Sequence, residues 1–304
     1  MMATPRELLD ELRPQRRASR LLYRGGGVWL TIGLAHVAVL AATGGEWSGA
    51  ISWRKPIVFG ISFGLMLVVV GWVLDQLPDR RLRAAVIAWP LLVSSSVEVG
   101  LITAQAWRGK ASHFNVFGSI DTAIFVVMGA MAGVFSLCLL AVFIWALIDR
   151  PADPLVRIAV IGGLALMMTG LGVGQWLIQI GSTLAQTRNA APDVVTYNSG
   201  GVPKFPHAVA LHGIQVLIVA ALMLRRTARS DSWRRMMMWL VTSSYVGVLV
   251  LSSGQAIAGQ APGSMSGWGV ATVVSFLILS LAMIWIVGEW WTAEPQESQL
   301  LTIP

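Results

Sequence analysis

Residues 56–77 read PIVFGISFGLMLVVVGWVLDQL, and Asp75, close to the end, is the only charged residue among them. A helix needs about 20 mostly apolar residues to cross the hydrocarbon core of a bilayer. Because an unpaired sheet edge cannot lie in lipid, this run favours a transmembrane helix. Membrane β-barrel strands instead alternate in polarity over about 10 residues, and this run does not alternate.

Similar stretches fill most of the 304-residue chain. The chain is 55% hydrophobic and only 12% charged, with a mean hydropathy of +0.68, whereas a soluble domain carries about 25% charged residues. We therefore predict an all-α polytopic membrane protein with eight transmembrane helices. The predicted spans lie near 27–44, 56–77, 82–106, 121–148, 154–183, 206–225, 234–258 and 268–291.

The 22 Lys and Arg residues are distributed unevenly between the two ends of these spans. Most precede the first span or lie in the loops after the second, fourth and sixth spans. The positive-inside rule therefore places both termini in the cytoplasm, and we expect a plasma-membrane protein. The net charge of +7 reports this topology, so we expect membrane lipids and no nucleic acid as partners, and protein partners are not indicated. The opposite side carries Arg54, Lys55, Arg108, Lys110, Arg188 and Lys204.

The chain divides into a basic N-terminal segment, 1–26, a membrane domain, 27–291, and a tail, 292–304. Both flanking segments are predicted to be cytoplasmic. The glycines at 25–27 precede the first span and indicate a hinge. The single cysteine, Cys138, excludes an intrachain disulfide and a cysteine-rich metal site.

A possible internal duplication relates residues 27–150 to residues 151–291 at an offset of 150. Residues 105–111 read QAWRGKA and residues 255–261 read QAIAGQA. Pro56 and Pro206 also match at this offset. A parallel four-plus-four repeat would place a pseudo-twofold axis along the membrane normal. A chance match in an Ala- and Gly-rich chain is the alternative.

Glu98 lies inside the third span, about two turns from its predicted outer end. A charged group in a bilayer costs roughly 2.5–3.5 kcal/mol on insertion scales, so such residues tend to be functional or paired. Ser94, Glu98 and Gln105 share one helical face. Glu98 is therefore a candidate general base or metal ligand, and a protonated packing residue is the alternative.

Three histidines, His113, His207 and His212, fall on the predicted outer side. Imidazole is the commonest metal ligand in proteins. These residues, with Glu98, are candidate ligands of a metal or cofactor. The i, i+5 spacing of His207 and His212 points them to different partners, and hydrogen-bonded packing is the alternative for each.

Further polar residues on the same side are candidates for catalysis or for binding a substrate or anion. Asp121 is the second candidate catalytic carboxylate. Lys55 could bind an anionic group, or it could extend from the end of its helix to the headgroup region. The remaining candidates for substrate or anion binding are Gln105, Arg108, Asn115 and Gln215.

Together these segments resemble a family of uncharacterised bacterial multi-pass membrane proteins that is common in actinobacteria. The resemblance runs from about residue 50 to 260. It implies a shared outer polar site but no mechanism, because the family has no established activity. It is carried by WRKP at 53–56, Glu98 with Gln105, RGKASHFN at 108–115, and Pro206-His207 with His212.

The eight-helix, four-plus-four layout also resembles haem A synthase, which holds haem between His pairs on paired helices of each half. Here the second and eighth spans contain no histidine. A bis-His haem in either half would therefore lack one ligand, unless His113 or His36 reaches the site.

Three functions follow from these patterns. The first is a membrane enzyme with a transition metal or haem, in which Glu98 or Asp121 acts as ligand or base. The second is a transporter or a lipid- or anion-handling protein, in which Glu98 exchanges protons. The third is a non-catalytic subunit or sensor. All uses of the site require Glu98 and the histidines to meet in one place.

Overall fold

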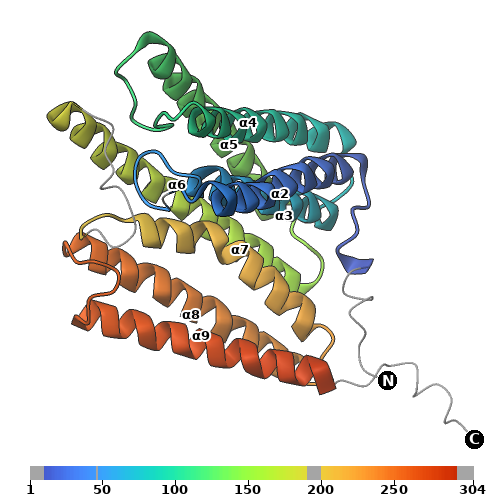
Figure 1. Cartoon of the computed structure of the whole chain (residues 1–304). Helices are drawn as coiled ribbons and strands as arrows, with labels where there is room; N and C mark the ends of the chain where they lie inside the picture. The colour runs from blue at the N-terminus through green and yellow to red at the C-terminus, as the bar shows by residue number, and fades with distance from the viewer. Residues whose placement is uncertain (1–9, 46, 190–199, 293–304) are drawn as a thin grey trace, which may run out of the picture.

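The computed structural model describes residues 10–45, 47–189 and 200–292. Within these ranges the chain is helical and contains no strand. Eight helices are long and apolar enough to cross a membrane, which confirms the predicted fold class. In the labels of Figure 1 they are α2 (Arg17–Thr43), α3 (Arg54–Gln76), α4 (Arg81–Trp107), α5 (Ser119–Ile148), α6 (Pro154–Arg188), α7 (Lys204–Leu224), α8 (Asp231–Ile257) and α9 (Gly267–Thr292).

Local sequence signals set several helix ends. The Asp153 carboxylate accepts hydrogen bonds from the backbone N–H groups of Leu155 (2.8 Å) and Val156 (3.0 Å), which starts α6. At the other end of a helix, Gly44 has a φ of +62° and terminates α2 in the left-handed conformation that glycine favours.

The glycines at 25–27 do not form a hinge, and the first helix begins ten positions before the predicted span. Helix α2 continues through them without a break. A Cβ added at Gly26 would lie 2.6 Å from the carbonyl oxygen of Gly64 on α3. Glycine is therefore needed here for close approach of two helices, and the hinge interpretation was wrong.

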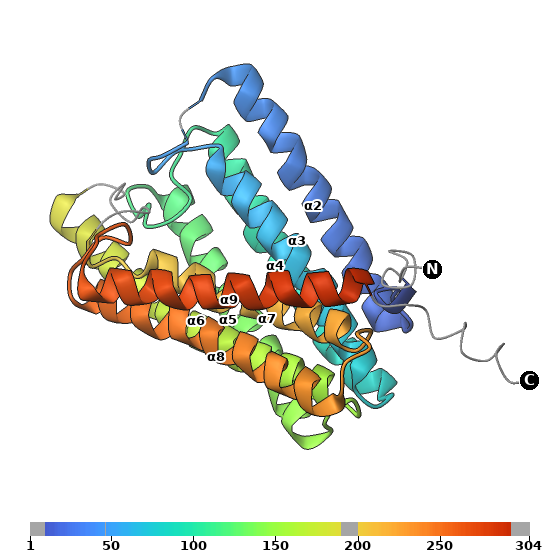
Figure 2. The same ribbon diagram turned by 90° about the horizontal axis from the view of Figure 1, so that it is seen from below.

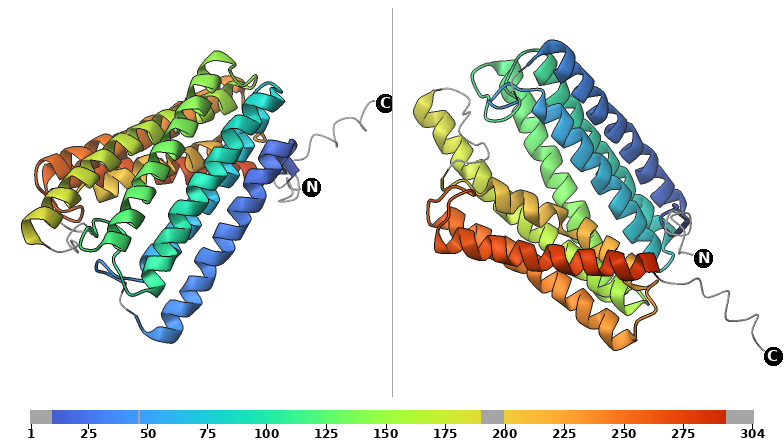
Figure 3. Two further views of the ribbon diagram at one scale, coloured as in Figure 1. Left: turned by 90° about the horizontal axis from the view of Figure 1, so that it is seen from above. Right: turned by 60° about the horizontal axis from the view of Figure 1, so that its bottom comes forward.

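Helices that follow one another in the chain pack in pairs, α2 along α3, α4 along α5, α6 along α7 and α8 along α9. Helices α2, α3 and α4 lie on one side of the molecule and α8 and α9 on the other (Figures 1 and 2). The described N-terminal segment and the end of α9 lie at the same end of the bundle, which we call the terminal end (Figure 3). The starts of α3, α5, α7 and α9 form the opposite, distal end.

Most of the buried polar side chains lie in the distal half of the bundle, although Ser19 and Thr227 are buried at the terminal end. The main apolar core draws on residues of the terminal half, among them Leu74, Leu91 and Met238. The candidate site lies at the distal end. The buried polar residues of the distal half include Arg54, Glu98, Gln105, Ser112, Asn115 and Gln255.

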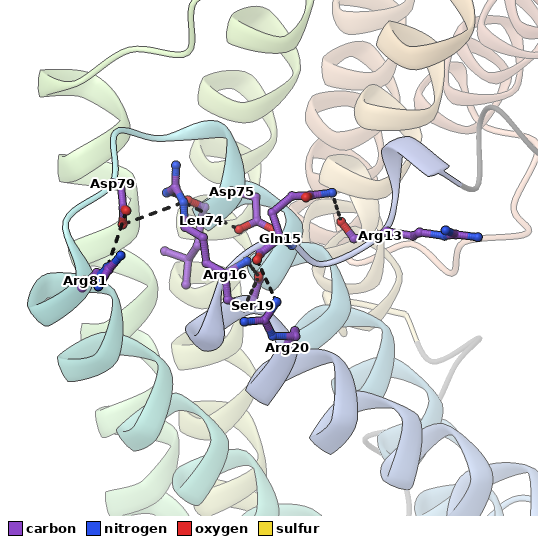
Figure 4. A network of polar contacts seen from close by, with 9 residues as sticks. All are labelled: Arg13, Gln15, Arg16, Ser19, Arg20, Leu74, Asp75, Asp79 and Arg81. Atoms are coloured by element: carbon purple, nitrogen blue, oxygen red, sulfur yellow. Dashed lines mark hydrogen bonds and ion pairs between the residues drawn. The ribbon is translucent and has the colours of Figure 1, made fainter.

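Charged residues at the terminal end form a network that joins the segment before α2 to the end of α3 (Figure 4). An Arg16 guanidinium nitrogen donates to the Leu74 carbonyl oxygen at 2.7 Å, and the backbone N–H of Gln15 donates to the Asp75 carboxylate at 2.8 Å. Asp79 lies 4.0 Å from Arg16 and 3.8 Å from Arg81. The residues just before α2 are therefore packed against the bundle.

Candidate functional site

Glu98 and His113, two of the predicted site residues, meet in the structure. Glu98 is only 6% exposed on α4, and its Oε1 atom lies 4.0 Å from Nε2 of His113 in the loop between α4 and α5. Its Oε2 atom is buried and accepts no hydrogen bond from any residue that the structure describes. A buried carboxyl oxygen without a hydrogen-bond donor is unfavourable. A ligand that donates a hydrogen bond to Oε2 would remove this penalty.

The loop between α4 and α5 is shaped to deliver His113. Phe114 has a φ of +59°, in the left-handed region that non-glycine residues seldom adopt. Its ring packs against Gly181 of α6, where a side chain would collide with it. In the same loop, Ser112 Oγ lies 2.9 Å from His113 Nδ1.

Burial, together with the positive charges of Lys55 and Lys204, lowers the pKa of His113 from 6.5 to about 3. The imidazole is therefore neutral at neutral pH. The Phe59 ring centroid lies 5.5 Å from the imidazole centroid. Neutral imidazole can donate from one nitrogen and accept at the other, so His113 can relay a proton next to Glu98.

Cations from two segments that are distant in the sequence act on one another, and two of them, Lys55 and Lys204, also act on His113. Arg54 and Lys55 open α3, and Lys204 opens α7. Arg54 is 9% exposed, and its Nε donates to the Trp47 carbonyl oxygen at 3.0 Å. Nζ of Lys55 donates to the Ala50 carbonyl oxygen at 2.7 Å. Lys204 lies within the electrostatic influence of both Arg54 and Lys55, so the ends of α3 and α7 share one positive region.

Sequence reasoning singled out Lys55 but missed Arg54 and Lys204 as site residues. The signal was present, because each stands two residues before a proline, Pro56 or Pro206, at the start of a helix. The sequence could not show that these two helix starts lie near each other.

A second cluster of predicted site residues ties the end of α4 to the start of α5. Asp121 Oδ1 accepts hydrogen bonds from Gln105 Nε2 (3.1 Å) and Arg108 Nη1 (2.9 Å). Arg108 also donates to Gln105 Oε1. The amide of Asn115 donates to the Ala111 carbonyl oxygen at 3.2 Å. These contacts hold the ends of the loop that carries His113, which is a positioning role.

The predicted residues on α7 face different neighbours. Nδ1 of His207 donates to the Gly170 carbonyl oxygen of α6 at 2.8 Å, so this ring holds α7 to α6. His212 is half-buried. The side-chain amide of Gln215 is buried without a hydrogen-bond partner among the described residues.

The predicted ligand set His113, His207, His212 and Glu98 is not assembled as a metal centre. In residues 10–45, 47–189 and 200–292, no group of three or more His, Cys, Asp or Glu side chains is arranged to hold a metal ion. His36, which lies outside the resemblance pattern, joins an aromatic cluster. Its Nε2 accepts a hydrogen bond from Trp107 Nε1 at 3.1 Å.

Comparison with known proteins adds no family to these findings. No protein-family model, no curated protein and no solved structure matches this chain.

Proposed function

We propose that this integral membrane protein binds an oxyanion of the phosphate type at the distal end, and that Glu98 and His113 exchange a proton beside it. The distribution of Lys and Arg predicts that this end faces away from the cytoplasm. The observations that support the proposal are the positive charges of Lys55 and Lys204, which act on His113, and the 4.0 Å separation of His113 Nε2 and Glu98 Oε1.

Burying like charges close together is unfavourable. Two unit charges 4 Å apart interact with about 4 kcal/mol at an effective dielectric constant of 20. Cations from α3 and α7 therefore repel one another, and an anion between them would turn repulsion into attraction. Arginine and lysine are the side chains that recognise phosphate and carboxylate oxygens.

Glu98 gives the site a group that can change charge. A carboxyl group within a membrane-spanning helix is expensive unless it serves a function or has a partner. Its Oε2 atom has no donor in the described structure, and neutral His113 lies 4.0 Å from Oε1. A small movement would bring the two side chains into hydrogen-bonding distance, which is the geometry of a proton-exchanging pair.

The structure favours binding at one face over transport through the bundle. The terminal half is filled by the apolar core, with Leu67, Leu74, Leu91, Ile214 and Met238 buried there, and a transported ion would need polar groups along that half as well. Among the described residues, only the contact between the His113 imidazole and the Glu98 carboxyl group supports a metal or haem enzyme. The Nδ1 atom of His207, one of its predicted ligands, donates to the Gly170 carbonyl oxygen and leaves Nε2 as the ring nitrogen that could bind a metal.

Thermal unfolding of the purified, detergent-solubilised protein with added anions tests the proposal. The probes are inorganic phosphate and a short-chain phosphatidic acid, with sodium chloride at matched ionic strength as the reference. A ligand at one hundred times its Kd stabilises the folded state by about 2.7 kcal/mol. We expect saturable stabilisation of the wild type, loss of this effect in Lys55→Gln, and no loss in Lys110→Gln, an exposed cation of the same end.

The two probes distinguish a free phosphate-type anion from a phosphate carried by a lipid headgroup. Stabilisation by both probes indicates a free phosphate-type anion, and stabilisation by phosphatidic acid alone indicates a lipid headgroup. The absence of saturable stabilisation by either probe, or equal loss in Lys55→Gln and Lys110→Gln, contradicts the proposal. A stoichiometric metal or a Soret band in the purified protein would favour the metal or haem enzyme instead.

A further inference from the structure

Three exposed arginines lie together at the terminal end, where α4 begins. Arg81 and Arg83 are in the first turn of α4, and Arg80 directly precedes it. Their side chains are 92%, 47% and 58% exposed, respectively. Helix α4 has 27 residues and is therefore about 40 Å long, which matches the thickness of a bilayer with its headgroups. The three guanidinium groups therefore lie at the level of the phospholipid headgroups.

The acidic residues near these arginines do not neutralise them one for one. The Asp149 carboxylate is shared, because its Oδ2 atom lies 4.0 Å from Nε of Arg80 and 3.5 Å from Nη1 of Arg83. Asp79 lies 3.8 Å from Arg81 (Figure 4) and is shared with the segment before α2. Three cations thus exceed the two carboxylates that they contact. Guanidinium groups bind phosphate oxygens through paired hydrogen bonds, so this cluster suits a phosphate-bearing partner.

An exposed apolar stripe runs along α4 from the arginine cluster toward the middle of the bundle. Leu82 and Val86 are 79% and 63% exposed, and Trp89 and Val93 are 57% and 51% exposed. Their spacing of i, i+4, i+7 and i+11 places them on one face of the helix. A shallow hollow of about 470 Å³ at the start of this face combines charged and apolar walls. It is lined by Arg80, Arg81, Leu82, Arg83 and Val86.

Helix α2 adds positive charge at the same level. A Cβ added at Gly25 would lie 2.2 Å from Cδ1 of Leu92 on α4, and four residues later Trp29 Nε1 donates to Ser96 Oγ at 3.0 Å. The two helices therefore run side by side in the same direction, with positions 67 apart facing each other. The first turn of α2, with the exposed Arg17, therefore lies beside the first turn of α4.

We propose that the start of α4 binds one anionic phospholipid from the membrane leaflet at the terminal end. Arg80, Arg81 and Arg83 hold its phosphate, and one acyl chain lies along Leu82 and Val86. The distribution of Lys and Arg predicts that this is the cytoplasmic leaflet. A zwitterionic choline headgroup fits less well, because its ammonium group is repelled by the arginines. This site is independent of the distal cluster, which lies at the other end of the bundle.

Native mass spectrometry of the full-length protein, released from detergent after incubation with phosphatidylglycerol or phosphatidylcholine, measures the affinity for each lipid. We expect the wild type to prefer phosphatidylglycerol. An arginine near a lipid headgroup contributes roughly fivefold to affinity. We therefore expect Arg81→Gln to lose about fivefold in phosphatidylglycerol affinity and the double variant Arg80→Gln/Arg81→Gln to lose more than tenfold. Arg81→Lys keeps the charge and should retain most of the affinity.

Two control variants distinguish this site from other cations. Arg235→Gln removes an exposed arginine at the start of α8, at the same end of the bundle, and Lys55→Gln alters the distal cluster. Both should bind phosphatidylglycerol at this site as the wild type does. Because the Arg81 side chain is 92% exposed, its variants should fold normally, as checked by size-exclusion profile and thermal midpoint.

Three outcomes would overturn the proposed lipid site. The first is equal affinity of the wild type for the two lipids. The second is a loss in Arg235→Gln as large as that in Arg81→Gln, which would indicate general attraction to a basic surface. The third is a preference that Lys55→Gln abolishes and the double variant Arg80→Gln/Arg81→Gln retains, which would assign the lipid to the distal end. Loss of the distal anion effect alone would leave this site standing.

Discussion

His113 and Glu98 form a small acid–base unit within a largely apolar bundle. The imidazole is neutral because burial and two lysine charges lower its pKa to about 3. It therefore stands near the carboxyl group without forming a permanent ion pair. A neutral imidazole can take a proton from a ligand or pass one to Glu98, whereas a protonated imidazole held by a carboxylate would be a fixed structural link.

The lowered pKa of His113 predicts that stability falls in acid. Between pH 6.5 and about 3, the unfolded chain binds a proton at His113 that the folded chain does not bind. The contribution of this group to the free energy of unfolding is therefore complete above pH 6.5 and decreases as the pH falls below it. At pH 5 the loss has an upper limit of about 2 kcal/mol, and because the side chain is 27% exposed we expect part of it.

The measurement is the thermal midpoint of the wild type and His113→Gln in detergent at pH 7 and pH 5. The amide variant does not titrate, so its midpoint should fall less on acidification than that of the wild type. Equal decreases in the two proteins would show that His113 is already accessible to protons when folded.

Glu98 could be identified from the sequence because a carboxyl group in an apolar span is unusual. The residue that meets it could not be derived from spacing. His113 lies in a loop where Phe114 adopts a positive φ and packs its ring against Gly181 of α6, and residue spacing does not reveal such a tertiary contact. Asp121, expected as a second catalytic carboxylate, instead anchors the loop through Gln105 and Arg108.

At the scale of elements, helix pairs depend on individual glycines, and neighbouring positions provide a matched test. A Cβ at Gly26 would press on the Gly64 carbonyl oxygen of α3, whereas a Cβ at Gly27 would meet nothing within 4 Å. We expect Gly26→Ala to lose about 1–3 kcal/mol of unfolding free energy. Gly27→Ala should be neutral or stabilising by up to about 1 kcal/mol. Unfolding in mixed micelles with increasing denaturing detergent compares the two, and similar losses would show that helix flexibility, not packing, requires these glycines.

The paired glutamines at the distal turns give a test that separates structure from function. Gln105 and Gln255 each close a turn with the same side-chain bond, so alanine at either position should cost about 1–3 kcal/mol of stability. Only Gln105 also bonds to Asp121, at the base of the loop that carries His113. We therefore expect Gln105→Ala to weaken anion binding more than Gln255→Ala does, as measured by calorimetric titration on variants matched for folding. The opposite order would assign ligand contact to the turn after α8.

The eight helices were predictable because span length and apolar composition are properties of each segment alone. The start of α2 was not predictable by the same reasoning. The glycines at 25–27 argue against a helix in isolation, and contact with α3 overrides that preference. The relation of Arg54 to Lys204 likewise depends on how α3 and α7 are placed.

At the scale of the whole molecule, polar contacts at the terminal end join the segment before α2 to the ends of α3 and α7. Glu11 accepts a hydrogen bond from Arg226 at 3.1 Å and lies 3.6 Å from Arg225 at the end of α7, while Arg16 and Gln15 contact the end of α3. Arg225 also pairs with Asp153 at 3.1 Å. The segment before α2 thus connects α3 to α7 at this end, as the proposed anion would at the distal end.

The orientation of the bundle decides which compartment supplies the ligand. The excess of Lys and Arg at the terminal end predicts that this end is cytoplasmic and that the distal cluster faces outward. Because Cys138 is the single cysteine and is buried, Cys138→Ala provides a background for labelling. We expect Met265→Cys, at an 80% exposed position of the distal loop, to react with a membrane-impermeant maleimide in intact cells. Arg81→Cys, at an exposed terminal position, should react only after the membrane is permeabilised. The reverse pattern would place the anion site in the cytoplasm and would assign its ligand to the cytoplasmic pool.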